Sequence, residues 1–365
     1  MGATRDAARG TEETWPGRDD SDHLRAAVAA ARKQQTPVTI RGSGSKAFLT
    51  EAAAQGGASL STLRHTGIVA YRPDELVVTA RAGTGLDELE HALRTHGQAL
   101  PFDPPRFGGG GTVGGAVAAG LSGPGRPWLG SVRDAVLGVR IVNGLGQSLA
   151  FGGQVLKNVA GYDVSRLMTG AYGTLGLILE ASMRVQPAPE AVAVLAKTCS
   201  ADEAATLVRG ILRKPLPVTG TCHVDGVLRI RLAGSADGVR HARDTLGIDL
   251  ESEDDQFFDT VRDHAHPFFQ RPGSTGTLWR LSLPRGAAFN QPDALVEWAG
   301  ARVWWRTDDD PDAVHAVAHD YQGFATPFGG GAPRTPDAVA KYMRRVKTAF
   351  DPDGILNPGA VADAD

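Results

Sequence analysis

The stretch GGGGTVGGAVAAG at residues 108–120 places a run of glycines in front of, and inside, a short segment of small residues with the composition of a tightly packed helix. Each glycine costs about 1 kcal/mol relative to alanine in ordered helix. Several glycines at a helix start therefore indicate that something approaches the backbone closely. Two interpretations stay open here: a wall against a phosphate or ring system, or a loop before a helix packed on a sheet.

A second glycine-rich stretch, RGSGSK at residues 41–46, directly follows the short apolar strand pattern of residues 37–40. Its glycines and hydroxyls allow successive N–H groups to face one anion, and Lys46 adds a positive charge. A pyrophosphate fits this description, although a plain turn after a strand has the same composition. The stretch matches neither G-x-x-x-x-G-K-S/T nor G-x-G-x-x-G followed by a helix.

The length and composition predict a soluble protein of more than one domain. The chain has 365 residues, more than one hydrophobic core usually organises, with 38 basic and 41 acidic residues. The sequence has no dense run of basic residues, so we do not expect it to bind nucleic acid. It also has no run of 18 apolar residues and no apolar leader, so we expect neither a membrane span nor secretion. Cys199 and Cys222 are too few for a disulfide framework or a cysteine-rich metal site. We expect a cytoplasmic protein.

Hydrophobic periodicity and turn residues predict an α+β fold. The expected elements before residue 189 are helices over 21–35 and 86–96, and strands over 68–71, 76–81, 136–142 and up to 151. After residues 187–189 (PAP) the glycine density drops, and the order becomes strand, helix from 201, strand to 223, strand to 232 and helix from 236. That order is typical of a ferredoxin-like unit. The final helix is expected over 335–350.

A third glycine stretch, GAYGTLGLI at residues 170–178, completes a pattern with the first two. A glycine loop after an early strand, a glycine-led helix and a Gly-Thr-Leu-Gly turn entering a strand resemble the FAD-binding domain of vanillyl-alcohol-oxidase (PCMH-type) flavoproteins. The chain is further similar to the FAD-binding subunits of glycolate oxidases. The stretches that carry this similarity are GSGSKAFL (42–49), GIVAY (67–71), GLSGPGRPW (120–128), GSVRD (130–134), KNVAGYDVSRLM (157–168), HPFF (266–269), LWRL (278–281) and FDPDGILNPG (350–359).

The resemblance implies a two-lobed fold with a PCMH-type FAD-binding domain over residues 1–188, an α+β cap domain over 189–334 and a C-terminal segment over 335–365 that returns to the first domain. It also implies the residues that contact FAD. These are Arg41, Gly42, Ser43, Gly44, Ser45, Lys46, Pro101, Gly111, Thr112, Val113, Gly114, Gly115, Asp134, Leu137, Gly138, Lys157, Gly161, Tyr162, Asp163, Thr174, Gly176, Ile178 and Asn357. Relatives with covalent flavin carry a histidine in the first glycine loop. Residues 41–46 contain none, so we expect non-covalent FAD.

Oxidation of a 2-hydroxy acid needs a group that accepts the hydroxyl proton and a cation for the carboxylate. His266 and Arg280 are the candidates, while a structural role for His266 and an intersubunit partner for Arg280 stay open. Catalytic relatives of the D-lactate type have a histidine-rich metal segment that this chain lacks. His315 and His319 have helical spacing, but we interpret them as a solvated face and expect no metal. Where relatives show Gly-Gly-His-Ala-Thr, residues 322–326 read Gln-Gly-Phe-Ala-Thr, with Phe324 at the histidine position.

The resemblance therefore implies an FAD-binding subunit of a complex that oxidises glycolate to glyoxylate. Its implied partners are a second, catalytic FAD subunit and an iron–sulfur subunit, with association at the inner face of the membrane through that complex left open. The alternative is a self-sufficient FAD-dependent dehydrogenase of D-2-hydroxy acids.

Overall fold

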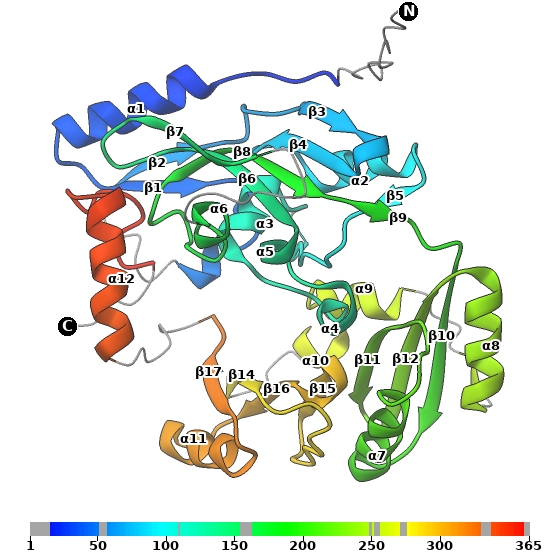
Figure 1. Ribbon diagram of the computed structural model, residues 1–365. Helices are drawn as coiled ribbons and strands as arrows, with labels where there is room; N and C mark the ends of the chain where they lie inside the picture. The colour runs from blue at the N-terminus through cyan, green and yellow to red at the C-terminus, as the bar shows by residue number, and fades with distance from the viewer. Residues whose placement is uncertain are drawn as a thin grey trace, which may run out of the picture.

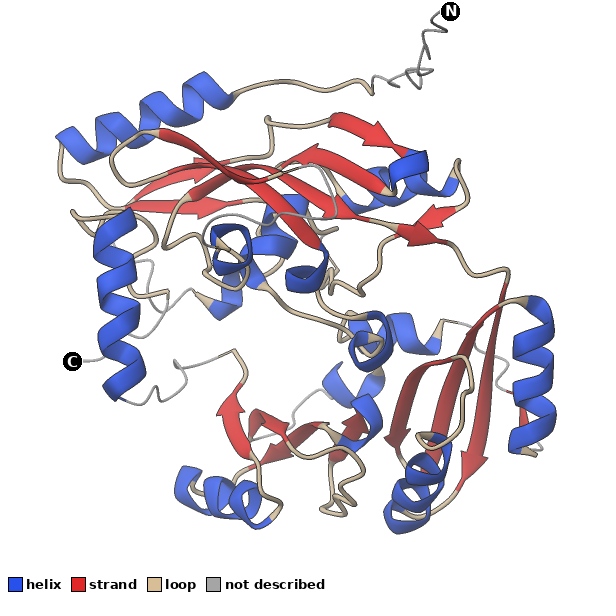
Figure 2. Ribbon diagram, viewed as in Figure 1, coloured by secondary structure: helices blue, strands red, loops and turns tan. Residues whose placement is uncertain are grey.

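The computed structural model describes residues 15–50, 57–108, 110–153, 163–247, 250–251, 256–270, 276–329 and 337–360. Two lobes are visible in Figure 1, one from the blue to green part of the chain and one from the green to orange part. Both lobes contain helices and antiparallel strands (Figure 2), which confirms the expected α+β class.

The first lobe is built on an antiparallel sheet whose described strands follow the order β3-β4-β8-β6-β7. Strands β1 and β2 form a separate parallel pair, and β5 pairs with β9. The strands are β1 (Val38–Arg41), β2 (Ala58–Ser61), β3 (Ile68–Arg72), β4 (Val77–Arg81), β5 (Gln98–Ala99), β6 (Val136–Val142), β7 (Ser148–Gly152), β8 (Leu177–Arg184) and β9 (Gln186–Pro187).

The helices of the first lobe are α1 (Ser21–Lys33), α2 (Leu86–Arg94), α3 (Val113–Ala119), α4 (Arg126–Leu129), α5 (Val132–Ala135) and α6 (Val164–Leu167). Helix α3 contacts strands β4 and β8, and α6 contacts β6 and β7, whereas α4 contacts a strand of the second lobe, β11 (Val218–Val224). Helix α1 buries Leu24, Val28 and Ala31, spaced as one helical face, and ends two residues before the expected Gln35.

The second lobe contains one antiparallel sheet with the described strand order β13-β10-β12-β11-β15-β16-β14-β17. Its first half has the chain order β10-α7-β11-β12-α8-β13, which confirms the ferredoxin-like arrangement. The elements are β10 (Ala191–Thr198), α7 (Ala201–Ile211), β11 (Val218–Val224), β12 (Val227–Gly234), α8 (Ala236–Leu246), β13 (Leu250–Glu251), α9 (Phe257–Arg262), α10 (Pro267–Gln270), β14 (Thr277–Ser282), β15 (Ala294–Glu297), β16 (Arg302–Thr307), α11 (Pro311–Asp320) and β17 (Phe324–Pro327). The change of sheet takes place between β9 and β10, and the division of the chain at residues 189 and 335 stays a proposal.

Strand register decides which side chains of the second lobe face the first. Arg280 in β14 pairs with Trp304 in β16, and Arg302 in β16 pairs with Glu297 in β15. Directly paired residues, and residues two apart on one strand, share a sheet face. Arg280, Glu297, Arg302 and Trp304 therefore share one face. The opposite face packs against α11 through a cluster that includes Trp279, Leu281, Val303 and Trp305.

The chain ends by returning to the first lobe. Helix α12 (Asp337–Phe350) is followed by a turn in which Leu356 forms a bridge with Val38 of β1. The Val38 N–H donates to the Ile355 carbonyl at 2.7 Å, and the Asn357 N–H donates to the Val38 carbonyl at 2.9 Å. Residues more than 300 positions apart thus meet beside the first glycine loop. No helix among the described residues combines the length and apolar character needed to cross a bilayer.

Candidate functional site

The first glycine loop forms one wall of a groove, which we call the glycine groove. It has a volume of about 100 Å³ and lies between the loop after β1, the start of α3 and the C-terminal turn. The residues that line it are Thr39 to Ala47, Thr50, Thr112, Gly115, Ala118, Ala119, Tyr172 and Asn357. The structure thus brings together all of residues 41–46 with Thr112, Gly115 and Asn357, which were predicted from well-separated parts of the chain.

Close packing explains why the loop needs glycine at its first position. A Cβ atom on Gly42 would come within 2.4 Å of Thr112 Oγ1. That hydroxyl is already engaged, because it caps α3 by accepting the Gly115 N–H at 3.2 Å. Gly44 has a φ of +78°, a conformation that glycine adopts readily. The loop can therefore lie against α3 because glycine occupies positions 42 and 44.

The polar groups of the groove suit a phosphate. Ser43 and Ser45 lie with their hydroxyl oxygens 3.3 Å apart, and Lys46 Nζ lies 3.4 Å from Ser45 Oγ. Burial lowers the pKa of Lys46 to about 8, and the negative charge of Asp263 only partly opposes this shift. Among the described residues no carboxylate forms an ion pair with Lys46. A half-buried cation without an ion pair, lying beside hydroxyls and backbone N–H groups, fits the pyrophosphate of a dinucleotide.

Asn357 holds the groove together from the C-terminal side. Its Oδ1 accepts the Ile40 N–H at 2.6 Å, and its Nδ2 donates to the Tyr172 carbonyl at 2.6 Å. A single side chain therefore joins strand β1 to the turn before β8. The φ of Asn357 is +40°, in the left-handed region where asparagine is enriched.

Other predicted contacts lie outside the groove or serve packing. A Cβ on Gly111 would meet Leu86 at 2.6 Å, and one on Gly114 would meet Ala82 at 2.7 Å, so these two glycines let the start of α3 and the residues before it pack on neighbouring elements. Val113 is buried, and its N–H donates to Thr84 at 2.9 Å. Gly138 lies against Gly153, and Gly176 lies against Ile141.

The remaining predicted residues are spread over the same lobe. Asp134 accepts from the Ser131 N–H and hydroxyl in a capping box, which lowers its pKa. Asp163 caps α6 by accepting the Arg166 N–H. Pro101, Thr174 and Ile178 are buried and Leu137 is half-buried. Lys157, Gly161 and Tyr162 lie outside the described residues, and contact of all these residues with FAD stays a proposal.

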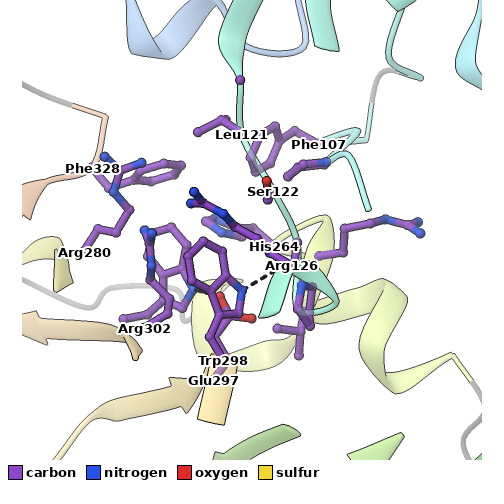
Figure 3. A pocket seen from close by; sticks show the side chains of 17 residues that line it. Phe107, Leu121, Ser122, Arg126, His264, Arg280, Glu297, Trp298, Arg302 and Phe328 are labelled. Atoms are coloured by element: carbon purple, nitrogen blue, oxygen red, sulfur yellow. Dashed lines mark hydrogen bonds between the residues drawn. The ribbon is translucent and has the colours of Figure 1, made fainter. Parts of the chain in front are cut away.

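A second cavity lies between the lobes, and we call it the arginine cavity (Figure 3). Its volume is about 50 Å³. The first lobe contributes residues on either side of α3 and in α4, and the second lobe contributes side chains from α9 and strands β14 to β16. The residues that line it are Pro105, Phe107, Gly120 to Pro124, Arg126, Val261, Arg262, His264, Arg280, Glu297, Trp298, Arg302, Trp304 and Phe328.

The two predicted catalytic residues have different positions. Arg280 lines the arginine cavity, whereas His266 is not among its lining residues. His266 instead accepts the Phe268 N–H through Nδ1 at 3.2 Å at the start of α10. His264 is the histidine that lines the cavity. Its ring stacks on Phe269 with centroids 3.9 Å apart, and burial lowers its pKa to about 3. A proton acceptor at His266 stays a proposal.

Sequence reasoning missed Glu297, Trp298 and Arg302. The signal that could have found them is the alternation of side chains in the hairpin over residues 294–307. In this hairpin the charged residues Glu297 and Arg302 lie on the sheet face that carries Trp304. The turn between the strands is unusual, because Trp298 and Ala299 both have a φ of +56°. A bulky residue in this conformation is a genuine outlier, and such strain often occurs at functional sites.

No group of three or more potential metal ligands was found within the described ranges. His315 and His319 both lie on α11, and the His315 ring meets Trp279 edge-on at 5.5 Å. Phe324, at the position where relatives have a histidine, is 63% exposed on the edge strand β17. The arginine cavity does not include it.

Comparisons with known proteins agree with this geometry. The family described as FAD binding domain matches residues 19–152, and the C-terminal domain of FAD linked oxidases matches residues 334–361. "Glycolate oxidase subunit GlcE" of Escherichia coli (strain K12) is 44% identical over 347 residues, which cover 93% of this chain and 97% of that protein. "Glycolate oxidase subunit GlcD" of Bacillus subtilis (strain 168) is 29% identical over 202 residues, covering 55% of this chain and 43% of that protein.

A solved structure of alkyldihydroxyacetonephosphate synthase superimposes with a TM-score of 0.68 over 93% of this chain and 74% of that one. At 16% identity this likeness concerns the fold alone. Together with the family matches and the relative at 44% identity, the glycine groove leads to one assignment. The chain is an FAD-dependent oxidoreductase that belongs to the family of glycolate oxidase subunits represented by GlcE.

Proposed function

We propose that this chain is the FAD-binding subunit of a complex that oxidises glycolate to glyoxylate and passes the electrons to partner subunits. The observation that carries the proposal is the 44% identity to GlcE over 93% of this chain. A match of this extent includes residues of both lobes, and so it is not confined to the FAD-binding lobe.

The chemistry of a 2-hydroxy acid divides between cofactor and protein. Bound FAD supplies the acceptor for the hydride of the C–H bond. The protein must hold the carboxylate and exclude water. Arg280 suits the first task, because its guanidinium lines a cavity whose walls include Phe107, Trp304 and Phe328. These aromatic rings suit the second.

The proposed partners are a second FAD-containing, catalytic subunit and an iron–sulfur subunit of the same oxidase complex. The word "subunit" in the names of GlcE and GlcD supports an assembly of this kind. We propose a cytoplasmic location, with contact to the inner membrane face only through the complex.

A stand-alone dehydrogenase is the second candidate. A "D-lactate dehydrogenase" of Anaerostipes hadrus is 31% identical over 173 residues, which cover 47% of this chain and 36% of that protein. This similarity spans much less of the chain. In the stand-alone case His266 is the proposed proton acceptor, although its Nδ1 already accepts the Phe268 N–H.

One experiment separates the two candidates. The FAD-loaded chain is mixed anaerobically with glycolate, with and without the co-expressed partner subunits, while the absorbance of oxidised flavin is followed. Bleaching that requires the partners supports the subunit role. Bleaching of the chain alone favours the dehydrogenase, with D-lactate as the matched second substrate. Absence of bleaching with the complete complex would refute glycolate oxidation.

A further inference from the structure

The arginine cavity holds more positive charge than its surroundings balance. Arg302 is 8% exposed, and its Nε has no hydrogen-bond partner among the described residues. Burial, together with repulsion from Arg280 and Arg126, lowers the pKa of Arg302 to about 9, although Glu297 opposes this. Burial likewise lowers the pKa of Arg280, again with Arg126 contributing. Three guanidinium groups therefore act on one another inside one small space.

Glu297 compensates only part of this charge. It is 2% exposed, its Oε1 accepts the Trp304 Nε1–H at 2.9 Å, and its Oε2 has no partner in the described part of the chain. Burial raises the pKa of Glu297 to about 7 despite the nearby Arg302. No ion pair within 4.0 Å joins the two side chains among the described residues. Buried charges without close partners are costly to maintain unless a ligand completes them.

The protein holds two of these cations in place in advance. The Arg302 guanidinium lies 4.1 Å from the centre of the Trp298 ring, and the Arg126 guanidinium lies 5.0 Å from it. Trp298 is fixed in turn, since its Nε1–H donates to the Gly123 carbonyl of the other lobe at 2.9 Å. The Trp298 ring lines the cavity, and its backbone has a φ of +56°, a conformation that a bulky residue rarely adopts. Such preorganisation is typical of a binding site.

We infer that the arginine cavity binds one small monocarboxylate, whose carboxylate pairs with Arg302 and Arg280, while the exposed Arg126 adds a third positive charge to the same wall. A cavity of about 50 Å³ has room for roughly three or four water molecules, so we expect it to favour a two-carbon acid over a four-carbon acid. The inference rests on the proposed function, because it names the residues that hold its substrate class. It adds Arg302 and Glu297 to the previously proposed Arg280.

The test measures binding rather than turnover. Acetate, which cannot be oxidised at a hydroxyl, is titrated into the FAD-loaded chain and followed by saturation-transfer NMR and calorimetry. Arg302→Met is expected to weaken acetate binding about 10- to 100-fold, the usual effect of losing a charge-assisted pair. Arg306→Met is the matched control. Arg306 lies on the same strand and is half-buried, but it donates to the Gly276 carbonyl outside the cavity.

Four results would overturn the inference. The first is equal acetate affinity in Arg302→Met and in the unaltered chain, and the second is butyrate that binds as tightly as acetate. The third is inorganic phosphate that binds more tightly than acetate with the same dependence on Arg302, and the fourth is a loss of FAD affinity in Arg302→Met equal to its loss of acetate affinity. The last result would mean that Arg302 holds the flavin. Arg302-dependent acetate binding in a complex that never oxidises glycolate would sustain the cavity and refute the proposed function. A complex that oxidises glycolate, in which Arg302→Met binds acetate as the unaltered chain does, would sustain the proposed function and refute the role of the cavity.

Discussion

The glycine groove and the arginine cavity are built in opposite ways. The groove consists mainly of backbone: a loop that closes on Thr112 because Gly42 has no Cβ, and a C-terminal turn held by Asn357. The charged groups of the cavity come mainly from side chains on strands of the second lobe, with Arg280, Glu297, Arg302 and Trp304 on one sheet face. A site made of backbone leaves a local glycine signature in the sequence, whereas a site made of cross-strand side chains does not.

The same difference predicts how each site fails. The groove should be sensitive to added volume, because a side chain has no space to occupy. The cavity should be sensitive to changes of charge, because its residues are mutually repelling cations around one carboxylate. Four substitutions, from the largest expected effect to the smallest, examine this comparison.

Gly42→Val should abolish measurable FAD binding, because its Cβ would lie 2.4 Å from Thr112 Oγ1 and push the loop off α3. Titration of FAD, followed by the quenching of its fluorescence, gives the affinity. Gly210→Val is the control, since a Cβ at that helical position would meet nothing within 4 Å apart from the adjacent backbone of its own helix. Gly42→Ala should show a graded loss. Full FAD affinity in Gly42→Val would show that the close packing of the loop is dispensable.

Lys46→Met should weaken FAD binding about 10- to 100-fold, because a charge-assisted contact to phosphate is lost. The pKa of about 8 adds a pH dependence. Below this pH Lys46 is protonated before and after binding. Above it, FAD must bind together with a proton, since a phosphate favours the charged amine. Affinity should therefore fall as pH rises from 7.5 to 9, and Lys46→Met should remove that fall. An identical slope in both proteins would place Lys46 away from the phosphates.

Much of the groove could be predicted from the sequence for a simple reason. Most other residue types are excluded at three places by the local backbone conformation or the packing. These places are the loop after β1, the glycines before α3 and the turn that enters β8. Asn357 was found only through the family resemblance, because nothing local links it to Ile40 and Tyr172. Gly111 and Gly114 show the limit of the signal, since their glycines serve packing against Leu86 and Ala82.

The cavity was predicted only at Arg280. Arg302 and Glu297 lie opposite each other because strands β15 and β16 pair in that register. The turn between these strands has positive φ at Trp298 and Ala299, and neither residue type favours positive φ. The choice of His266 followed its neighbouring aromatic residues in sequence. The chain turns so that His264, two residues earlier, lines the cavity.

Asn357→Ala should lower FAD affinity and thermal stability together, because the Ile40 N–H and the Tyr172 carbonyl both lose their partner. Leaving such groups unsatisfied costs about 1–3 kcal/mol. The melting temperature of the FAD-free chain separates the structural part of the loss from the part due to cofactor binding. Asn143→Ala, which removes an asparagine from the turn between β6 and β7, is a control away from the groove. A variant that melts earlier yet binds FAD unchanged would limit Asn357 to a structural role.

The smallest effect concerns Glu297. Because the pKa of Glu297 is about 7, a rise in pH from 6 to 8 places a negative charge on it, beside Arg302. The other charged or titratable groups that act on this pair are Arg280, Arg126, Asp103 and the buried Cys222 thiol. An ionised Glu297 competes with a carboxylate ligand for these cations. Repulsion of about 1 kcal/mol should lower acetate affinity about 5-fold across this range. Glu297→Gln should bind acetate equally at both pH values, with Arg302 still charged in each. If affinity instead rose with pH, or kept its slope in Glu297→Gln, the titrating group would be another one, and the charge balance assigned to this cavity would be wrong.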